Sequence, residues 1–283
     1  MIHKNSVVLI VGLGLIGGSY AKGLKKYGCT VYAITRSQAT VDYALQNGII
    51  DKGSVTEDSA LIGRADFVVF GLYPITMLEW LERNRRFFKK GALITDVSGV
   101  KCGVVDRAQE LLPETVEFIG SHPMAGREVS GVQYSDERMF EAANFIITPT
   151  PENTQNGIAF ADELARILGF RHIAVLTPKE HDEMIGFVSQ LTHALAVSLM
   201  NTKDNTHLKE YTGDSFRDLT RIAKINEDLW SELFFLNGEV LVREIDDFVA
   251  ELENLKKKIA QHDEEGLKEL FRQSARRRAE FDR

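Results

Sequence analysis

The chain has 283 residues, 44% of them hydrophobic and 27% charged, which is enough for one large domain or two ordinary domains with a sizeable core. Its formal net charge is −7, and the basic cluster at residues 276–278 lies among acidic residues as on a solvated helix face, so we expect no nucleic-acid partner. Cys29 and Cys102 show neither a disulfide pattern nor metal-ligand spacing, so we expect no metal. The apolar N-terminal run is too short and too glycine-rich for a signal peptide or a bilayer span, which predicts a cytoplasmic protein without a membrane partner.

The first predicted elements are a buried strand, a glycine-rich turn and a helix, at residues 7–19 (VVLIVGLGLIGGS). Val7–Val11 are apolar without alternation, as in a strand covered on both faces. A GxGxxG motif follows, whose glycines permit the turn, the approach of a pyrophosphate and close packing of the helix on the strand. The free N–H groups of the helix N-terminus attract phosphate, so we expect a dinucleotide site at Gly12, Gly14, Leu15, Ile16 and Gly17. The alternative is a glycine-rich turn in another kind of α/β domain.

The second predicted strand, Thr30–Ile34, ends in Thr35, Arg36 and Ser37. A site for NAD usually carries Asp or Glu at this point to bind the ribose hydroxyls, and none is present here. Two hydroxyls and a guanidinium suit a 2′-phosphate better, so we predict NADP as the cofactor. The alternative is that Arg36 stacks on adenine and the cofactor is NAD.

Strands and helices continue to alternate over the next 110 residues. Strands are predicted at residues 66–72, 92–97, 116–120 and 145–148, and helices at residues 76–88 and 102–112. This βαβ rhythm predicts a mostly parallel sheet with helices on both faces, which is a Rossmann-type α/β fold. The polar loops after Leu72, Val97 and Gly120 should therefore line one crevice at the carboxyl ends of the strands.

Beyond Thr177 the strand signals stop and apolar residues recur at helical spacing, as at Leu191, Leu195 and Leu199. We therefore predict a dinucleotide-binding domain at residues 1–177 and an all-α domain for substrate binding and dimerisation at residues 178–283. The last two predicted helices, residues 252–259 and 267–281, have charged outer faces that could pack against a partner subunit.

A dinucleotide-binding fold followed by a helical domain suggests a hydride-transfer enzyme, which needs a base for the hydroxyl proton and a cation for an acidic substrate. Three side chains have this chemistry. His122 follows a predicted strand and could act as the base, or merely cap a loop. His193 lies among apolar residues on a predicted helix and could be functional or a satisfied core residue. Arg221 lies between apolar positions; it is either neutralised by Asp218 and Glu128 or binds a substrate carboxylate. The pair at residues 181–182 could be a hinge or, as we expect, a helix N-terminal cap.

Five strings in order resemble the prephenate/arogenate dehydrogenase family: GLGLIGGS, SHPMAGRE, the His-Asp pair at 181–182, SQLTHALA and FRDLTRIAKINEDLW. The likeness runs from about residue 5 to residue 250. It implies oxidative decarboxylation of prephenate to 4-hydroxyphenylpyruvate, with hydride transfer to NAD(P), in tyrosine biosynthesis. The alternative is an arogenate dehydrogenase that gives tyrosine directly.

The resemblance also implies roles for individual residues. His122 is similar to the family's catalytic histidine, and Ser98 to a serine near it, although the family commonly has Gly-Ser where this chain has Ser98-Gly99. The contact from Ser98 to the catalytic histidine is therefore either kept from a shifted backbone or lost. The expected substrate-binding residues are His193, Arg221, Glu128, Asp218 and Trp230. Relatives dimerise through the helical domain, so a homodimer is expected.

Asp214 replaces part of a glycine-rich turn of the family and could favour the amino group of arogenate. Two further readings stay open. A 3-hydroxyacid-type dehydrogenase would use a lysine of the helical domain, and none stands out in a suitable helix motif. A nucleotide sensor that binds NADP without catalysis would have no use for His122 or Arg221.

Overall fold

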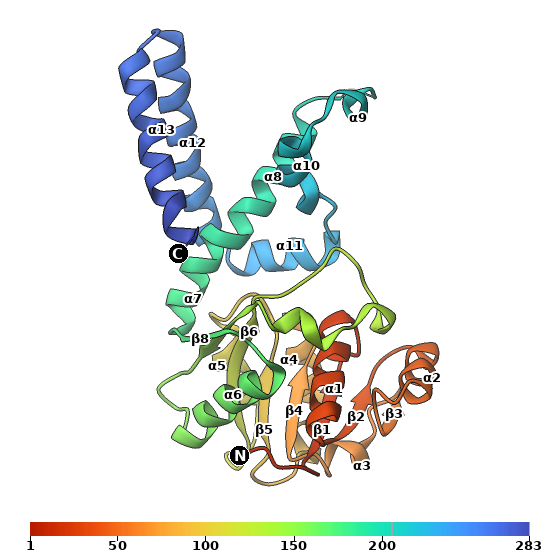
Figure 1. Ribbon diagram of the computed structural model, residues 1–283. Coiled ribbons are helices and arrows are strands. Elements are labelled where there is room, and N and C mark those ends of the chain that lie inside the picture. The colour runs from red at the N-terminus through yellow and green to blue at the C-terminus, as the bar shows by residue number, and fades with distance from the viewer. Residues whose placement is uncertain (205, 283) are drawn as a thin grey trace.

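The computed structural model describes residues 1–204 and 206–282, in an α/β half and a helical half (Figure 1). Within these residues eight strands form one sheet, in the order β3-β2-β1-β4-β5-β6-β7-β8. The strands are β1 (Val7–Val11), β2 (Thr30–Ile34), β3 (Lys52–Ser54), β4 (Phe67–Phe70), β5 (Leu93–Asp96), β6 (Glu117–Pro123), β7 (Asn144–Thr148) and β8 (His172–Val175). Neighbours from β3 to β6 are parallel, β7 is antiparallel to β6, and β8 is parallel to β7. The predicted Rossmann-type α/β half is confirmed.

Strand β1 is covered on both faces, as its unbroken apolar run predicts. Val8 and Ile10 belong to one core cluster, whereas Leu9 and Val11 belong to another on the opposite face. Helices α1 and α6 contribute to the first cluster, and α3, α4 and α5 to the second. The helices of this half are α1 (Leu15–Tyr27), α2 (Gln38–Gln46), α3 (Ser59–Ile62), α4 (Pro74–Asn84), α5 (Val104–Leu111) and α6 (Gln155–Leu168), with short 3-10 turns η1 (Arg85–Phe87), η2 (Val132–Tyr134) and η3 (Glu137–Phe140).

Three strands differ from the sequence-based prediction. Strand β6 runs beyond residue 120 to Pro123, so His122 lies within a strand and not in the loop after it. Pairing with β7 supports this extension, because His122 lies opposite Ile146 in the antiparallel ladder. Strands β3 and β8 were not predicted, since each is only three or four residues long and lies at an edge of the sheet.

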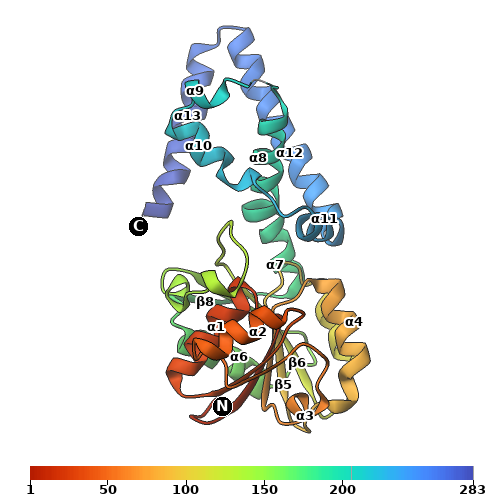
Figure 2. The same ribbon diagram turned by 90° about the vertical axis from the view of Figure 1, so that its right-hand side faces the viewer.

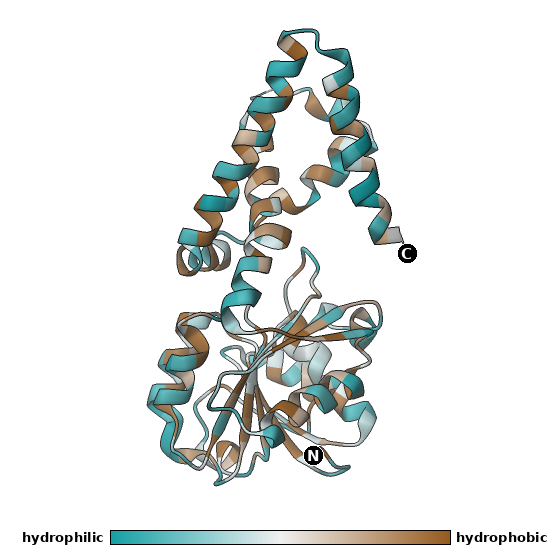
Figure 3. Ribbon diagram, turned by 90° about the vertical axis from the view of Figure 1, so that its left-hand side faces the viewer, coloured by the Kyte–Doolittle hydropathy of each residue, from teal (hydrophilic) through white to brown (hydrophobic). Residues whose placement is uncertain are grey.

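The helical half begins at α7 and, within the described residues, contains no strand. Its elements are α7 (Pro178–Ile185), η4 (Gly186–Leu191), α8 (Thr192–Asn201), α9 (Leu208–Tyr211), α10 (Asp214–Thr220), η5 (Arg221–Ala223), α11 (Glu227–Leu236), α12 (Gly238–Ala260), α13 (Glu264–Ala279) and η6 (Glu280–Asp282). Figure 2 shows α7 next to the sheet, with α12 and α13 projecting away from it as a hairpin. Figure 3 shows largely hydrophobic strands, whereas the projecting helices carry hydrophobic and hydrophilic residues side by side.

Helix α7 starts with a capping box rather than with the His-Asp pair. The Thr177 hydroxyl accepts the backbone N–H of Glu180, and the Glu180 carboxylate accepts the N–H of Thr177. His181 and Asp182 lie one turn further on and are buried, so the expectation that they form the cap is wrong.

One helical run, Pro178–Asn201, is long and apolar enough to cross a membrane by length and composition alone. A core helix of a folded protein meets the same criteria. Here three polar side chains of the run, His181, Asp182 and Gln190, are buried and hydrogen-bonded to the rest of the protein. These bonds tie the first half of the run into the protein interior.

Candidate active site

The glycine-rich turn has the shape that a dinucleotide requires. Gly12 has φ +96°, and a Cβ there would overlap the carbonyl oxygen of Gly71, which follows β4. A Cβ on Gly17 would overlap the carbonyl oxygen of Gly12, so this glycine allows α1 to pack on β1. Gly14 is different, because no heavy atom lies within 4 Å of the position of its Cβ. The open face of Gly14 and the first amides of α1 therefore fit a pyrophosphate.

This turn lies where the strand order reverses, between β1 and β4. In open parallel sheets, ligands bind at such a point, beyond the carboxyl ends of the strands. Gly71 was not singled out from the sequence, although its place after the β4 strand was a usable signal.

The end of β2 carries the three predicted cofactor residues. Thr35 is partly buried, and Arg36 and Ser37 are exposed. The Ser37 hydroxyl accepts the N–H of Thr40 at 3.3 Å and so caps α2, which leaves its own proton available to a ligand. The Arg36 guanidinium makes no ion pair within the described part of the chain.

A buried ion pair lies under the neighbouring loop, at the end of β5. Lys101 Nζ donates to Asp96 Oδ2 at 2.6 Å, and both side chains are inaccessible to solvent. The same ammonium donates to the carbonyl oxygen of Ser121 at 2.6 Å and to Ser98 Oγ at 3.3 Å, so all three of its donors are used. Burial lowers the pKa of Lys101, and the charge of Asp96 partly offsets that shift.

Ser98 belongs to this buried network. Its hydroxyl is hydrogen-bonded to the Asp96 carboxylate and lies 3.0 Å from the carbonyl oxygen of Val100. No hydrogen bond joins Ser98 to His122 among the described residues. Instead, the neighbouring Gly99 faces the histidine, and a Cβ there would lie 3.7 Å from both Cε1 and Nε2 of His122.

His122 is linked to the helical half by a chain of hydrogen bonds. Its Nδ1 lies 2.9 Å from Nε2 of His181, and Nδ1 of His181 lies 2.6 Å from Oδ1 of Asp182. The Asp182 carboxylate also accepts the backbone N–H groups of Lys101 and Cys102, at 2.9 and 2.8 Å. Helix α7 is thereby joined to the loop after β5 and to strand β6.

The electrostatics of this group favour a neutral His122 and an ionised Asp182. The pKa of His122 is lowered well below its usual value by burial, by His181 and by the charge of Lys101. Burial opposes ionisation of Asp182, but the hydrogen bonds from His181 and from the Cys102 and Lys101 amides outweigh it and lower its pKa. Burial also lowers the pKa of His181, against the raising effect of Asp182.

The predicted substrate-binding residues form a second group, made by the helical half together with Glu128 from the loop after β6. The rings of His193 and Trp230 are stacked with centroids 3.6 Å apart, and His193 Nδ1 lies 2.9 Å from the carbonyl oxygen of Ser189. Burial lowers the pKa of His193, and the opposing effects of Glu128 and Arg221 show that both charges lie nearby. Arg221 forms an ion pair with Glu128. Four of the five predicted residues therefore lie together.

Two details of this group differ from expectation. Arg221 is not buried, because 62% of its side-chain surface is exposed. Asp218 is exposed on α10 and makes no ion pair with Arg221 within the described residues, so Glu128 alone neutralises the guanidinium there.

Helix α11 connects the two groups. Trp230, which stacks on His193, and Leu233 are three residues apart and so share one helix face. A Cβ on Gly99 would lie 3.7 Å from Leu233 Cδ1, which places Leu233 next to His122 across Gly99. Helix α11 therefore reaches both groups: Leu233 lies near Gly99 and His122, and Trp230 stacks on His193.

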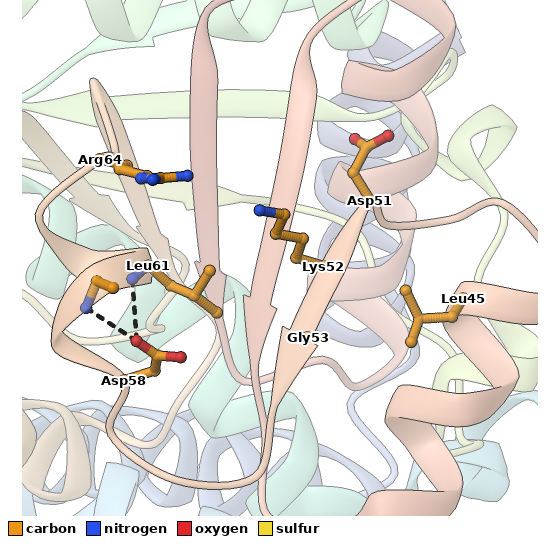
Figure 4. Close-up of a pocket in the computed structure, with 8 residues that line it drawn as sticks. Leu45, Asp51, Lys52, Gly53, Asp58, Leu61 and Arg64 are labelled. Carbon is orange, nitrogen blue, oxygen red and sulfur yellow. Dashed lines mark hydrogen bonds between the residues drawn. The ribbon is translucent and has the colours of Figure 1, made fainter.

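A separate hollow lies beside the edge strand β3 (Figure 4). It is lined by residues that include Asp51 and Lys52, at the start of β3, and Asp58, Leu61 and Arg64. Asp58 already accepts the N–H groups of Ala60 and Leu61, and Asp51 forms an ion pair with Lys25. Both of these carboxylates, which line the hollow, therefore have structural roles.

Sequence reasoning did not identify Asp96, Lys101, His181 or Asp182 as site residues. Only the His-Asp dipeptide carried a usable signal, because it is one of the strings that resemble the family. A buried lysine resembles a surface lysine in sequence.

Comparison with known proteins gives a consistent result. The family model "Prephenate dehydrogenase, nucleotide-binding domain" matches residues 20–174, and "Prephenate dehydrogenase, dimerization domain" matches residues 177–273. Prephenate dehydrogenase of Lactococcus lactis is 34% identical over 93% of this chain and 74% of its own length. Cyclohexadienyl dehydrogenase of Zymomonas mobilis is 30% identical over 96% and 94%. The crystal structure of prephenate dehydrogenase from A. aeolicus with hydroxyphenyl propionate and NAD+ superposes with a TM-score of 0.90 at 31% identity, covering 99% of this chain and 100% of that one.

Proposed function

The chain belongs to the prephenate dehydrogenase family, and on that premise we propose that it converts prephenate to 4-hydroxyphenylpyruvate by oxidative decarboxylation, in tyrosine biosynthesis. The observation that carries this proposal is the position of His122 near the carboxyl end of β6, with helix α11 reaching from Gly99 to His193, whose charged neighbours include Arg221. A ring hydroxyl and a carboxylate of one substrate can be held by His122 and Arg221.

His122 is the proposed base. Its lowered pKa keeps it neutral, so Nε2 can accept the proton of the ring hydroxyl. NAD(P)+, when bound at the glycine-rich turn, supplies the hydride acceptor. Loss of CO2 aromatises the ring, and His122 returns its proton to the phenolate oxygen, so that the product is a phenol. Ser98 acts indirectly, because its hydroxyl donates a hydrogen bond to the Asp96 carboxylate that pairs with Lys101.

Arg221 is the proposed carboxylate anchor. Its guanidinium can bind a carboxylate through two parallel N–H groups, and its present partner is the carboxylate of Glu128. His193 and Trp230 line the same side and offer a flat surface to the substrate ring. We propose Asp218, three residues before Arg221 in the chain, as a second acid near this site.

The first experiment measures the absorbance of reduced nicotinamide with prephenate as substrate. We expect turnover, and in His122→Gln a loss of kcat of about 10²- to 10⁴-fold, the usual contribution of a general base. The control is His172→Gln, an exposed histidine of β8, which should keep the full rate. An unchanged rate in His122→Gln would remove His122 from the mechanism.

We propose that NADP is the preferred cofactor, with NAD as the alternative. The support is the absence of a carboxylate at the end of β2 and the exposed guanidinium of Arg36. The relative from A. aeolicus was solved with NAD+, which supports the alternative. Arg36→Ala should lower kcat/KM for NADP about tenfold or more, the worth of a charged hydrogen bond, and change that for NAD little. Equal losses with both cofactors would favour stacking of Arg36 on adenine.

Arogenate is the alternative substrate. Asp214 is supported as a specificity residue only by its charge, since its side chain is 95% exposed and lies near Arg217. If it favours the amino group, Asp214→Gly should raise the ratio of prephenate to arogenate turnover. An unchanged ratio removes this role.

The remaining proposals concern organisation. We propose a domain boundary after Thr177, because β8 ends at Val175 and α7 begins at Pro178. We propose a homodimer through the helical half, supported by the "dimerization domain" description of the matching family model. A cytoplasmic location agrees with a soluble biosynthetic enzyme.

A further inference from the structure

We propose that His181 and Asp182 are positioning residues that hold His122 in the tautomer with the proton on Nδ1, so that a bare Nε2 faces the substrate. The inference rests on the proposed role of His122 as the base and deepens it. It stands on the hydrogen-bond chain from Asp182 through His181 to His122.

The starting point is that an ionised carboxylate can only accept hydrogen bonds. The hydrogen bonds that Asp182 accepts include one from Nδ1 of His181 and one from each of the backbone N–H groups of Lys101 and Cys102. The two backbone donors hold the carboxylate in place. His181 must therefore carry a proton on Nδ1 in order to make its 2.6 Å contact.

The rest of the chain follows from the chemistry of imidazole. A neutral ring has one N–H and one acceptor nitrogen, so His181 with a proton on Nδ1 has a lone pair on Nε2. That lone pair lies 2.9 Å from Nδ1 of His122, which must donate to it. His122 then has its own lone pair on Nε2. The opposite placement of the protons, on Nε2 of both histidines, would require a protonated Asp182 to donate to Nδ1 of His181. The lowered pKa of the Asp182 carboxyl disfavours this.

Other charged groups nearby do not compete for this contact. Lys101 has all three of its ammonium donors on Asp96, Ser121 and Ser98. Asp96 in turn is occupied by Lys101, Ser98 and the backbone N–H of Ser121. The side chain of Asn237 donates to the backbone oxygen of Asp182 at 2.9 Å and leaves its carboxylate free for His181. The proton position in His122 is thus set from helix α7.

The arrangement also assists the reaction after proton transfer. When Nε2 takes the hydroxyl proton, His122 becomes an imidazolium, and its Nδ1 proton can remain or pass to Nε2 of His181. In both cases the positive charge faces the ionised Asp182 through buried hydrogen bonds. No atom is consumed, and the proton returns along the same path to the product.

The direct test is ¹⁵N NMR of the histidine rings in the protein without any ligand, with His122 assigned by its absence in His122→Gln. We expect a protonated Nδ1 and an unprotonated Nε2 in His122 at neutral pH. In His181→Leu, which removes the acceptor of the Nδ1 proton, we expect the Nε2–H form of His122 to become populated. A wild-type His122 with its proton on Nε2 would overturn the inference.

Kinetics give a second test. Asp182→Asn should lower kcat about 100-fold or more and leave the KM for prephenate nearly unchanged, because the base and not the binding site is affected. Glu183→Gln, at the exposed neighbour on α7, is the control and should keep the wild-type rate. A fall in KM and kcat together with lost thermal stability would indicate only a structural role.

Because Asp182 also accepts hydrogen bonds from two backbone amides, a pair of variants at His181 separates folding from the orientation of His122. His181→Gln keeps an acceptor oxygen for Nδ1 of His122, whereas His181→Leu removes it. We expect Gln to retain at least tenfold more activity than Leu at equal thermal stability, and equal rates would contradict the inference. If the NMR result holds but prephenate is not turned over, the proposed reaction fails and the tautomer inference stands.

Discussion

At the scale of single residues, the site depends on a buried ion pair whose two charges neutralise each other. Lys101 and Asp96 are both fully buried and in contact, and Ser98 and Ser121 complete their hydrogen bonds. Such a pair contributes little net stability, but each member requires the other. The pair also places a positive charge close enough to His122 to lower its pKa.

This leads to a prediction about stability. Lys101→Met should reduce the free energy of unfolding by about 3–5 kcal/mol, because Asp96 is left buried without its counter-charge. The double variant Asp96→Asn with Lys101→Met should recover most of that loss. Urea denaturation of both variants is the measurement, and a double variant as unstable as the single one would contradict the argument.

The pH dependence of catalysis follows from His122. The proposed base acts in its neutral form, and burial, His181 and Lys101 all lower the pKa of His122 well below 6.5. Activity should therefore be present above that lowered pKa and be lost as the pH falls through it. The acid limb of kcat/KM for prephenate is expected below pH 6.5, measured over the range in which the protein stays folded. An acid limb above pH 6.5 would show that the ring is not shielded in this way.

At the scale of elements, the glycine-rich turn from β1 to α1 contains two glycines with different roles. Gly17 has no room for a side chain, because its Cβ would overlap the Gly12 carbonyl oxygen. Gly14 has open space and φ −89°, which any residue can adopt.

The two alanine variants should therefore separate folding from binding. Gly17→Ala should cost about 1–3 kcal/mol or more of stability, as overpacking does. Gly14→Ala should keep the thermal midpoint and weaken dinucleotide binding, because the methyl group occupies the path of the pyrophosphate. Thermal unfolding and titration with NADP and NAD check both. Full binding by Gly14→Ala would move the phosphate site elsewhere.

At the scale of the whole molecule, the helical half leaves apolar surface uncovered in a single chain. Along α12, Val242, Val249, Leu252 and Ile259 recur at intervals of seven, three and seven residues and are between 48% and 59% exposed. A stripe with this spacing is the seam by which helices pack on one another. Arg221, in the same half, is also exposed.

A second copy of the chain is the proposed occupant of this stripe. Val249→Glu combined with Leu252→Glu should convert the dimer to a monomer, as measured by light scattering after size-exclusion chromatography. Lys257→Glu, an exposed change on another face of α12, should leave the dimer intact. A dimer that survives the double change would place the interface on other helices.

Local sequence determined much of this protein. The apolar run of β1, the three glycines and the helical spacing beyond residue 177 predict the α/β half, the dinucleotide turn and the all-α half, because strand burial, turn sterics and helix periodicity act within a few residues. The tertiary structure decided the rest. His122 meets His181 from 59 positions away, Lys101 is buried and Arg221 is exposed. Burial and proton position depend on neighbours brought together by folding, and a short stretch of sequence does not contain those neighbours.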